Sequence, residues 1–337
     1  MTETTSHPRE GVSREWNYRP EGSVETNPLF AWPPRPIATL IWLKKSWLEL
    51  SASLLWLVLA GAVYAWLQPT YETMRELTPA WMLQIWARNV GLICLLAGGL
   101  HLWLYRYRRQ GKLLKFDHRD QAENNGNFSF RNQLFDNMFW TLASSVSFWT
   151  LWEIAYFWSA ANGWVPTLSI AGNPTWFVAM FLIIPIWSSF HFYWVHRLLH
   201  WPPLYRAAHA LHHRNINVGP WSGISMHPIE SFLFYTTFLF HWVVASHPVH
   251  FLFHAYYQSL GPVLSHSGFE GLVVRDKKQL EMGTFYHQLH HRYFECNYGT
   301  MEMPWDRWFG SFHDGSEEGT KAARTRMREK LVTRVGN

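Results

Sequence analysis

Cysteine is nearly absent from this 337-residue chain, which contains only Cys94 and Cys296. The two thiols lie far apart in the sequence, and neither has a second cysteine near it. This scarcity excludes a disulfide framework and any metal or iron–sulfur site built from cysteine. A glycine-rich nucleotide fingerprint is missing as well. The chain therefore offers no cysteine-held redox cofactor and no recognisable nucleotide site.

Charged residues are also scarce, at 16% of the chain against about 25% in typical soluble domains. Aromatic residues are abundant instead: they make up 18% of the sequence, and the chain contains 22 tryptophans. Trp and Tyr are favoured at membrane–water boundaries, because the ring is apolar while its N–H or O–H stays hydrated. The charges collect at the chain ends and in a few loops. This composition indicates a membrane protein.

The net charge of +5 comes from clusters rather than from one broad basic patch. The strongest cluster directly follows an apolar segment and comprises Arg106, Arg108, Arg109, Lys112, Lys115 and Arg119. A basic cluster beside a membrane span favours the cytoplasmic leaflet, so no nucleic-acid partner is expected. Residues 1–23 are polar and lack the apolar core of a cleavable signal peptide.

The long uncharged stretches predict an all-α, polytopic membrane fold. About four transmembrane helices are expected, at residues 50–71, 85–105, 137–158 and 175–195. Arg88, near the start of the second, has to snorkel or face protein. Between residues 231 and 269 there is no Asp, Glu, Lys or Arg, and a Ser-His-Pro sequence interrupts this run. A re-entrant segment or a short helical hairpin is predicted there.

The charge distribution divides the chain into four regions. Positive charge falls on one side at each return of the chain, which places the histidine-rich region in the cytosol. The regions are a cytosolic tail (1–36), transmembrane helices (37–195), a histidine-box region (196–312) with its membrane hairpin (229–268), and a basic tail (313–337). The expected architecture is a multi-pass membrane domain topped by a cytosolic cap of short helices.

Histidines are concentrated late in the chain, where 16 of the 19 lie between His191 and His313. Positions i, i+3 and i+4 share one face of a helix, so an H-x-x-H-H box is expected to aim three imidazoles at one point. Two consecutive prolines, Pro202 and Pro203, end the first helix and begin the one that carries the second box. The boxes are HRLLH (His196, His200), HALHH (His209, His212, His213) and HQLHH (His287, His290, His291).

These boxes indicate metal binding. Imidazole is a common ligand of late first-row metals and binds in its neutral form. A single zinc takes three or four protein ligands, so eight histidines in three boxes suit two metals with open positions. The alternative is coincidence on aromatic-rich helices, and two copies of H-x-x-H-H count against it. His196 and His200 alone would be undecided, but their place just before HALHH favours ligation.

Other histidines receive a different interpretation. Four of them lie in or near an apolar aromatic run, which favours packing or interface roles: His241, His247, His250 and His254. His227 precedes Pro228, with Glu230 in the following turn, and two roles stay open for it. It caps a helix that starts at the proline, or it is a ligand or a residue behind a ligand.

The order of HRxxH, HxxHH, His-Ser-Gly and HxxHH resembles the fatty acid hydroxylase superfamily, which includes sterol C4-methyl oxidases, C5 desaturases and lipid hydroxylases. Residues 193–197 are similar to the family's YWxHR signature, and His227-Pro228 is similar to its HPxE. The segment at residues 266–268 resembles the one that supplies a further ligand, and residues 305–310 resemble the closing WDxxFG. The likeness covers roughly residues 190–310.

The resemblance implies a non-haem site with two iron ions and O2 as co-substrate; zinc found after purification would reflect metal exchange. Family hydroxylases often have a histidine four residues before the position of His266, where this chain has Pro262. Because this histidine is missing, either one metal has fewer ligands or another residue, such as His227, takes its place as a ligand. The acidic residue often found before YWxHR is replaced by Ser189. The implied ligands are His196, His200, His209, His212, His213, His266, His287, His290 and His291, with His227 as a further candidate.

The chemistry expected of such a site is oxidation of a lipid. An unactivated C–H bond is inert to acid–base catalysis, whereas a redox metal can reduce oxygen and abstract hydrogen; zinc lacks redox chemistry. Hydroxylation of a lipid or sterol-like substrate is the expected reaction, with desaturation of the same substrate class as the alternative. The sequence has no fused cytochrome b5-like segment, so electrons are expected from a separate donor, a ferredoxin, a cytochrome b5 or a reductase.

Two other classes of protein compete with this interpretation. A membrane zinc hydrolase would need a carboxylate inside the box, as in H-E-x-x-H, and neither H-x-x-H-H box has one. A histidine-rich metal transporter or metal-binding protein would place ionisable residues along its spans, whereas these histidines gather at the cytosolic rim. The expected location is a bacterial inner membrane or the endoplasmic reticulum, with the boxes facing the cytosol.

Overall fold

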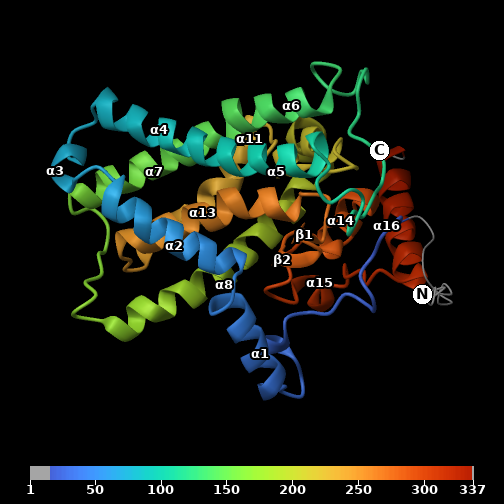
Figure 1. Ribbon diagram of the computed structural model, residues 1–337, viewed down its shortest axis with the longest axis horizontal. Helices are drawn as coiled ribbons and strands as arrows, with labels where there is room; N and C mark the ends of the chain where they lie inside the picture. Colours follow the sequence, from blue (N-terminus) through green and yellow to red (C-terminus); the bar gives the residue numbers. More distant parts are fainter. Residues whose placement is uncertain (1–15, 336–337) are drawn as a thin grey trace.

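The computed structural model describes residues 16–335, so the first 15 residues of the predicted N-terminal tail lie outside the described part of the chain. Figure 1 shows a mostly helical molecule in which long helices run along its length and short elements gather at one end. The predicted helical class is confirmed in this coarse sense. A small antiparallel hairpin of β1 (Gly271–Val274) and β2 (Lys277–Glu281) adds strands that the sequence does not predict.

The first half of the chain builds most of the long helices. Three π-helical turns, η2, η3 and η4, lie within these helices without breaking them, so residues 79–106 and 133–161 each form one continuous helix. The elements in chain order are η1 (Pro28–Phe30), α1 (Pro36–Trp47), α2 (Ala52–Trp66), α3 (Tyr71–Met74), α4 (Pro79–Ile93), η2 (Cys94–Gly98), α5 (Gly99–His101), η3 (Leu102–Arg106), α6 (Gln133–Trp140), η4 (Thr141–Ser145), α7 (Val146–Ala161) and α8 (Pro174–Leu199).

Within residues 16–335, two helices are long and apolar enough to cross a membrane, Pro79–Arg106 and Pro174–Leu199. Helices α1 and α2 meet at a bend of 42° and make a third candidate if they act as one span. The predicted third span falls in the α6–α7 helix, which is not among the candidates found in residues 16–335. The structure therefore supports a membrane protein with two or three candidate spans, fewer than the four that the sequence predicts.

The outer surface of these helices is apolar. Large side chains that are more than half exposed include Val58, Trp66, Leu95, Val178 and Val243. In water such a surface would lead to association, whereas lipid tails solvate it without cost. The exposed side chains therefore agree with a membrane around the long helices.

Helix α13 (Pro248–Ser265) lies at the centre of the molecule and packs against α2, α7 and α8 (Figure 1). It follows α11 (Pro228–Tyr235), η7 (Thr236–Leu239) and α12 (Phe240–Val243), and most of its side chains are buried. The uncharged run at 231–269 therefore forms helical segments on both sides of the Ser-His-Pro interruption. Its place in a membrane stays a prediction. Helix α13, which forms the second part of this run, is buried in protein on nearly all sides, whereas the first part exposes Phe232 and Val243.

A buried ion pair joins α4 to α7. Arg88 donates to the carboxylate of Glu153, and the two side chains are 7% and 0% exposed. Asn89 donates to the same carboxylate over 3.0 Å, and Arg88 also donates to Gln68 over 2.9 Å. Arg88 therefore faces protein, which is one of the two positions expected for a cation in an apolar helix.

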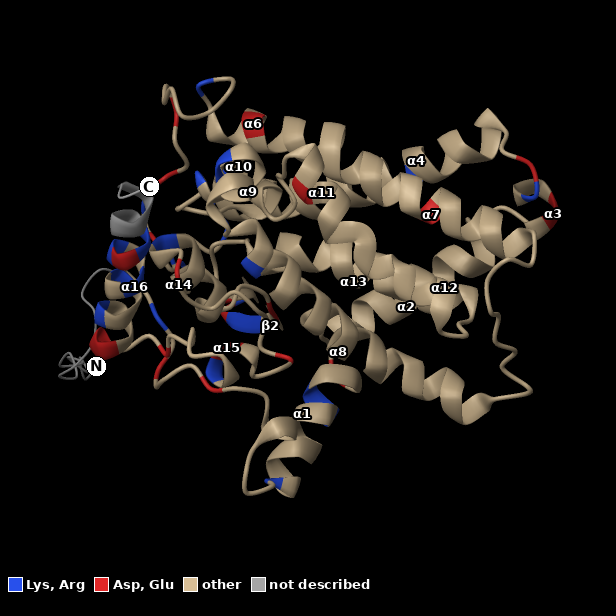
Figure 2. Ribbon diagram, turned by 180° about the vertical axis from the view of Figure 1, so that it is seen from behind, with Lys and Arg blue, Asp and Glu red and all other residues tan. Residues whose placement is uncertain are grey.

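The short elements lie at the other end of the molecule, where most of the charged residues gather (Figure 2). Helix α8 ends at Leu199 and the next helix begins at Pro202, as the pair of prolines predicts. The basic tail forms α16, which packs on α14. The elements are α9 (Pro202–Leu204), η5 (Tyr205–His209), α10 (Ala210–His213), η6 (Pro220–Ser222), α14 (Phe285–Tyr293), α15 (Trp305–Trp308) and α16 (Glu317–Val335).

Candidate metal centre

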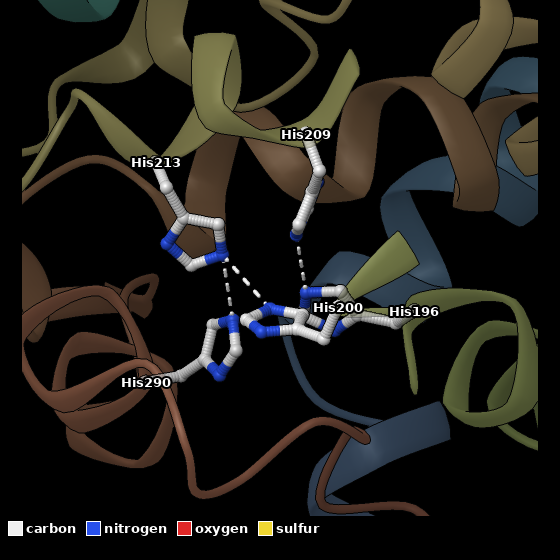
Figure 3. A group of neighbouring side chains, drawn as sticks. All are labelled: His196, His200, His209, His213 and His290. Atoms are coloured by element: carbon white, nitrogen blue, oxygen red, sulfur yellow. Dashed lines mark hydrogen bonds between the residues drawn. The ribbon is translucent and has the colours of Figure 1, made fainter. Parts of the chain in front are cut away.

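Five buried imidazoles from three segments of the chain converge on one point (Figure 3). Nε2 of His213 lies 3.1 Å from Nε2 of His200 and 3.0 Å from Nε2 of His290. Nε2 of His196 lies 3.1 Å from Nε2 of His209. One nitrogen from each of the five rings falls within 4.8 Å of the others. We term this group cluster 1: His196, His200, His209, His213 and His290.

Four further imidazoles form a second group. Nε2 of His266 lies 2.9 Å from Nε2 of His287 and 3.0 Å from Nε2 of His291. The ring of His212 completes the group, with its centre 4.8 Å from that of His291. We term this group cluster 2: His212, His266, His287 and His291. The structure thus brings all nine histidines implied by the family resemblance into two clusters.

Each H-x-x-H-H box is divided between the clusters, so the expectation that its three imidazoles aim at one point is wrong. His209 and His213 belong to cluster 1, while His212 belongs to cluster 2. The HQLHH box does the reverse, sending its first and last histidines to cluster 2 and His290 to cluster 1. At 3.6 residues per turn, positions i and i+4 lie about 40° apart, whereas i+3 lies about 100° from i+4. One box therefore reaches two centres.

Backbone carbonyls hold the ring nitrogens that point away from cluster 1. Nδ1–H of His196 donates to the carbonyl of Tyr298 over 2.6 Å, and Nδ1–H of His290 donates to the carbonyl of Cys296 over 2.6 Å. With a hydrogen on Nδ1, a neutral ring carries its lone pair on Nε2, the nitrogen that faces the other rings. The surrounding backbone therefore selects the tautomer that a metal ligand needs.

The side chain of Glu230 fixes the tautomer of His209 in the same way. Its carboxylate accepts a hydrogen bond from Nδ1–H of His209 over 2.7 Å, and both side chains are almost completely buried. The sequence predicts Glu230 only as a residue in the first turn of a helix, so its contact with a histidine of cluster 1 is a finding of the structure. The HPxE motif is the signal that could have indicated it.

The closing WDxxFG motif organises the loop behind His196. Asp306 is 1% exposed and accepts hydrogen bonds from the backbone N–H of Tyr298 over 2.9 Å and of the next residue over 2.8 Å. The hydroxyl of Ser311 donates to it over 2.5 Å, and the hydroxyl of Tyr286 also donates. Because Tyr298 provides the carbonyl that holds His196, Asp306 orients that ring through the loop. The sequence resemblance indicates the motif without this role.

The structure shows the surroundings of the two positions that the sequence leaves open, His227 and Pro262. His227 caps α11, where its Nδ1 accepts a hydrogen bond from the backbone N–H of Ile229 over 3.2 Å, and it belongs to neither cluster. The carbonyl of Pro262 accepts a hydrogen bond from Nδ1–H of His266 over 2.9 Å. Cluster 2 thus has four imidazoles against five in cluster 1, and no fifth joins it within residues 16–335.

Burial keeps the imidazoles of the clusters neutral. Loss of hydration lowers the pKa of His212 to about 4. Burial, followed by repulsion between neighbouring rings, lowers the pKa well below its usual range in His200, His209, His213, His287, His290 and His291. A neutral imidazole binds a metal without first losing a proton, so the clusters are ready for metal at neutral pH.

The donor set fits metal ions. In a neutral ring that is protonated on Nδ1, Nε2 carries a lone pair, so lone pairs of several rings point at one another inside each cluster. No hydrogen atom is left to lie between such atoms, whereas a cation at the centre binds them all. Imidazole-only sites suit late first-row metals, iron among them. Clusters 1 and 2 are therefore candidate metal centres.

An apolar cavity of about 240 Å³ opens beside both clusters. Its histidine side is formed by His196, His209, His212, His266 and His287. The rest of the wall is mostly apolar and includes Trp56, Phe192, Leu199, Met226, Phe234 and Leu264. This space would hold an apolar molecule against both clusters, so it is the candidate catalytic cavity, and we refer to it below as the catalytic cavity.

Fold and site together define a helical membrane protein with two adjacent histidine clusters beside an apolar cavity. Residues 178–311 match the fatty acid hydroxylase family. They form a domain of the fatty acid hydroxylase/sterol desaturase superfamily, which confirms the resemblance seen in the histidine boxes. Members of this superfamily are oxygen-dependent oxidoreductases.

The curated relatives include sterol desaturases of fungi and a plant. The Delta(7)-sterol 5(6)-desaturase of Eremothecium gossypii is 32% identical over 141 residues, which are 42% of this chain and 38% of that protein. ERG3 of Saccharomyces cerevisiae is 33% identical over 121 residues, or 36% of this chain and 32% of that protein. The Nicotiana tabacum Delta(7)-sterol-C5(6)-desaturase is 29% identical over 172 residues, 48% of this chain and 60% of that protein. The chain therefore spans less than two thirds of these relatives. No solved structure matches the chain significantly.

Proposed function

We propose that this chain is a membrane-bound diiron oxygenase that oxidises a C–H bond of a lipid or sterol-like substrate, using O2 and electrons from a separate donor. The observation that carries the proposal is the convergence of nine imidazoles, in two groups, on one apolar cavity. The oxygen-dependent chemistry of the superfamily supports it.

Iron bound in the two clusters would supply the one-electron redox chemistry that reduces oxygen and breaks an unactivated C–H bond. The chain's own residues orient the ligands and the substrate. The carbonyls of Tyr298 and Cys296 and the carboxylate of Glu230 hold three rings with Nε2 directed inward. The apolar wall of the cavity excludes water and aligns a lipid against the histidines.

Hydroxylation and desaturation both remain candidate outcomes of this chemistry. Each uses one O2 and two electrons per turnover, and they differ in whether the product gains a hydroxyl group or a double bond. The curated relatives are named for desaturation of a sterol at the 5(6) position, which supports desaturation. The name of the matching family supports hydroxylation. Product analysis for an alcohol or an alkene separates the two.

A second hollow supports access for a lipid. It measures about 480 Å³, lies against α1, α2 and α8, and shares Tyr257, Met301 and Glu302 with the catalytic cavity. The hydroxyl of Tyr257 donates to Glu302 over 2.8 Å in this shared wall. A lipid that arrives between the long helices would meet this wall before it reaches the histidines.

The test is metal analysis of the full chain purified in detergent and reconstituted with iron. We expect about two irons per chain, as in other two-metal sites. His200→Ala removes a ring from cluster 1 alone, and His287→Ala removes one from cluster 2 alone, so each variant should lose about one iron. His227→Ala is the matched control, because His227 lies outside both clusters, and it should keep both irons.

Three results would contradict the proposal. A folded chain that binds no iron after reconstitution removes its basis. Tight binding of zinc with exclusion of iron would favour a hydrolase. Passage of metal across the membrane of a proteoliposome that contains the chain would favour a transporter.

A further inference from the structure

A second set of buried histidines lies in the apolar half of the molecule and belongs to neither cluster. Nε2 of His241, in α12, lies 3.0 Å from Nδ1 of His254, in α13, and both rings are 0% exposed. Nδ1 of His241 lies 2.8 Å from Oγ of Ser246, and Nε2 of His254 lies 2.9 Å from Oγ of Ser188 in α8. We term this line the hydroxyl–imidazole chain: Ser246, His241, His254 and Ser188.

Both rings of this chain are neutral. The line begins at a backbone carbonyl and ends at a serine hydroxyl, so it contains no carboxylate that would balance an imidazolium. A charged ring in this position would lose its hydration without compensation. Each neutral imidazole therefore has one N–H donor and one nitrogen acceptor.

The direction of every hydrogen bond in the hydroxyl–imidazole chain follows from its first member. The hydroxyl of Ser246 donates its only hydrogen to the carbonyl of Val244 over 2.9 Å. Ser246 must then accept from Nδ1–H of His241, which leaves a lone pair on Nε2 of that ring. Nδ1–H of His254 donates to this lone pair, and Nε2 of His254 in turn accepts from the hydroxyl of Ser188.

A second hydroxyl group, that of Thr237, also lies near Nε2 of His254. The hydroxyl of Thr237 lies 3.2 Å from Nε2 of His254, compared with 2.9 Å for Ser188. Nε2 has a single lone pair in the ring plane, and the shorter contact uses it. The hydrogen of Ser188 therefore points to His254, and the two lone pairs of its oxygen are left to accept.

Ser188 is also part of the wall of the catalytic cavity. An oxygen that only accepts, placed in a mostly apolar wall, pairs best with a neutral donor, and the hydroxyl group of a lipid is such a donor. Building on the proposed function, we propose that Ser188 accepts a hydrogen bond from the hydroxyl group of a lipid alcohol and so determines which lipids bind. His254 and His241 are positioning residues that hold the hydrogen of Ser188 away from the cavity.

A hydrogen bond between Ser188 and the lipid would also determine which carbon atoms of the lipid reach the histidines. Ser188 and His196 lie on the same helix, about two turns or 12 Å apart along its axis. Because α8 is one continuous helix, the distance from the hydroxyl-binding oxygen to cluster 1 is fixed. A lipid held at its hydroxyl would therefore present carbons at a set distance from that group to the histidines. The curated relatives act on sterols, which are alcohols, and this agrees with the proposal.

The experiment measures binding rather than turnover. The probes are a fluorescent sterol with a free 3-hydroxyl, its 3-methyl ether and its 3-ketone, added to the iron-loaded chain in detergent. Energy transfer from the tryptophans, of which the chain has 22, reports binding. We expect the wild type to bind the alcohol about three- to tenfold more tightly than the ether, the usual range for one hydrogen bond. Ser188→Ala should bind the two equally, and Ser188→Thr, which keeps a hydroxyl, should retain the preference.

A positioning role for His254 predicts a different signature. In His254→Phe the hydrogen of Ser188 is free to point into the cavity, so the preference should move from the alcohol toward the ketone. Loss of packing alone would weaken all three probes equally. Ser144→Ala is the matched control, because it removes a buried hydroxyl that contacts Ser231 at 2.8 Å and does not line the catalytic cavity. Its preference should equal that of the wild type.

Several results would overturn the proposal. A wild type that binds none of the probes, or binds all three equally, removes the lipid-alcohol site. Retention of the preference in Ser188→Ala assigns it to another residue, and loss of the preference in Ser144→Ala shows a general effect of destabilisation. If Ser188→Ala does not fold, the comparison of Ser188→Thr with His254→Phe decides. Absence of iron or of an oxidised product, with the preference intact, would overturn the proposed function alone.

Discussion

Two sets of buried histidines occupy this molecule, and they differ in how their nitrogens meet. In clusters 1 and 2 the Nε2 atoms of several rings face one another at 2.9 to 3.1 Å. In the hydroxyl–imidazole chain, Nε2 of one ring meets Nδ1 of the next, and the line ends on serine hydroxyls. In the clusters, nitrogen lone pairs point at one another, and a cation between them would remove their repulsion. In the hydroxyl–imidazole chain, every hydrogen-bond donor already has an acceptor, so no cation is required. The arrangement of the nitrogens therefore separates candidate metal ligands from histidines that are paired by hydrogen bonds, although both kinds are buried.

Sequence spacing does not make this distinction. His250 and His254 stand four residues apart on a helix, as do His196 and His200. Yet Nε2–H of His250 donates to the carbonyl of Phe177 over 2.9 Å, and its Nδ1 accepts from a backbone N–H over 3.0 Å. These partners agree with the packing role that the apolar surroundings predict. A pair of histidines becomes part of a metal centre only where other histidine-bearing segments meet it.

The largest expected effect is that of acid on the stability of the metal-free protein. The pKa of His212 falls from 6.5 to about 4 on burial, so between these values the unfolded chain binds protons that the folded chain does not. The free energy of unfolding of the metal-free protein should therefore decrease as the pH is lowered through this window, and six other cluster rings with lowered pKa values add to the loss. Melting temperatures of the metal-free protein, measured by tryptophan fluorescence from pH 7.5 to 4.5, test this. A melting temperature that does not fall over this range would contradict it.

Asp306→Ala should have the next largest effect, because it removes the acceptor of several buried hydrogen bonds. Hydrogen bonds to a charged group contribute about 1.5 to 3 kcal/mol each, so a loss of about 3 kcal/mol or more in the free energy of unfolding is expected. The effect should be accompanied by weaker iron binding at cluster 1, since the loop behind His196 loses its anchor. Asp120→Ala is the control: its ion pair with Arg108 is exposed, and its loss should cost less than about 1 kcal/mol in denaturant titrations. Equal effects in both variants would refute the anchoring role.

The smallest expected effect is a change in iron affinity on substitution of Glu230, which contacts cluster 1 but not the hydroxyl–imidazole chain. Removal of a residue that holds a ligand from behind usually lowers metal affinity about 10- to 100-fold. Glu230→Ala should reach this range in competition with a chelator, while Glu230→Gln, which keeps an acceptor oxygen for His209, should lose less. His254→Phe, in the hydroxyl–imidazole chain, should leave iron affinity unchanged. An alanine variant with wild-type affinity would mean that His209 needs no support from the carboxylate.

Much of the site could be predicted because its determinants are local. The boxes are short helical patterns, and the nine histidines that they and the His-Ser-Gly segment supply are the ones that the structure brings together. The division of each box between two clusters could not be predicted, since it depends on where neighbouring segments stand. The same holds for Glu230 and Asp306, which act through contacts with residues distant in the sequence.

The fold could be predicted in class but not in the number of spans. Hydropathy finds uncharged runs, and such a run results either from lipid or from burial in protein. Helix α13 is uncharged because protein surrounds it, and the predicted third span belongs to a helix whose inner face packs against α4 and α11. The sequence does not predict the β1–β2 hairpin because its two strands have only four and five residues, which is too short for a clear strand pattern.

The ion pair between Arg88 and Glu153 bears on how the protein is made. Arg88 lies in a candidate span, where an unpaired charge is costly, and Glu153 neutralises it. Glu153 is synthesised 65 residues after Arg88, so the helix that carries Arg88 leaves the ribosome well before its counter-ion. The helix that carries Arg88 is therefore expected to become stable in the membrane only after the helix that carries Glu153 has been made, so that the two assemble as one unit of biogenesis.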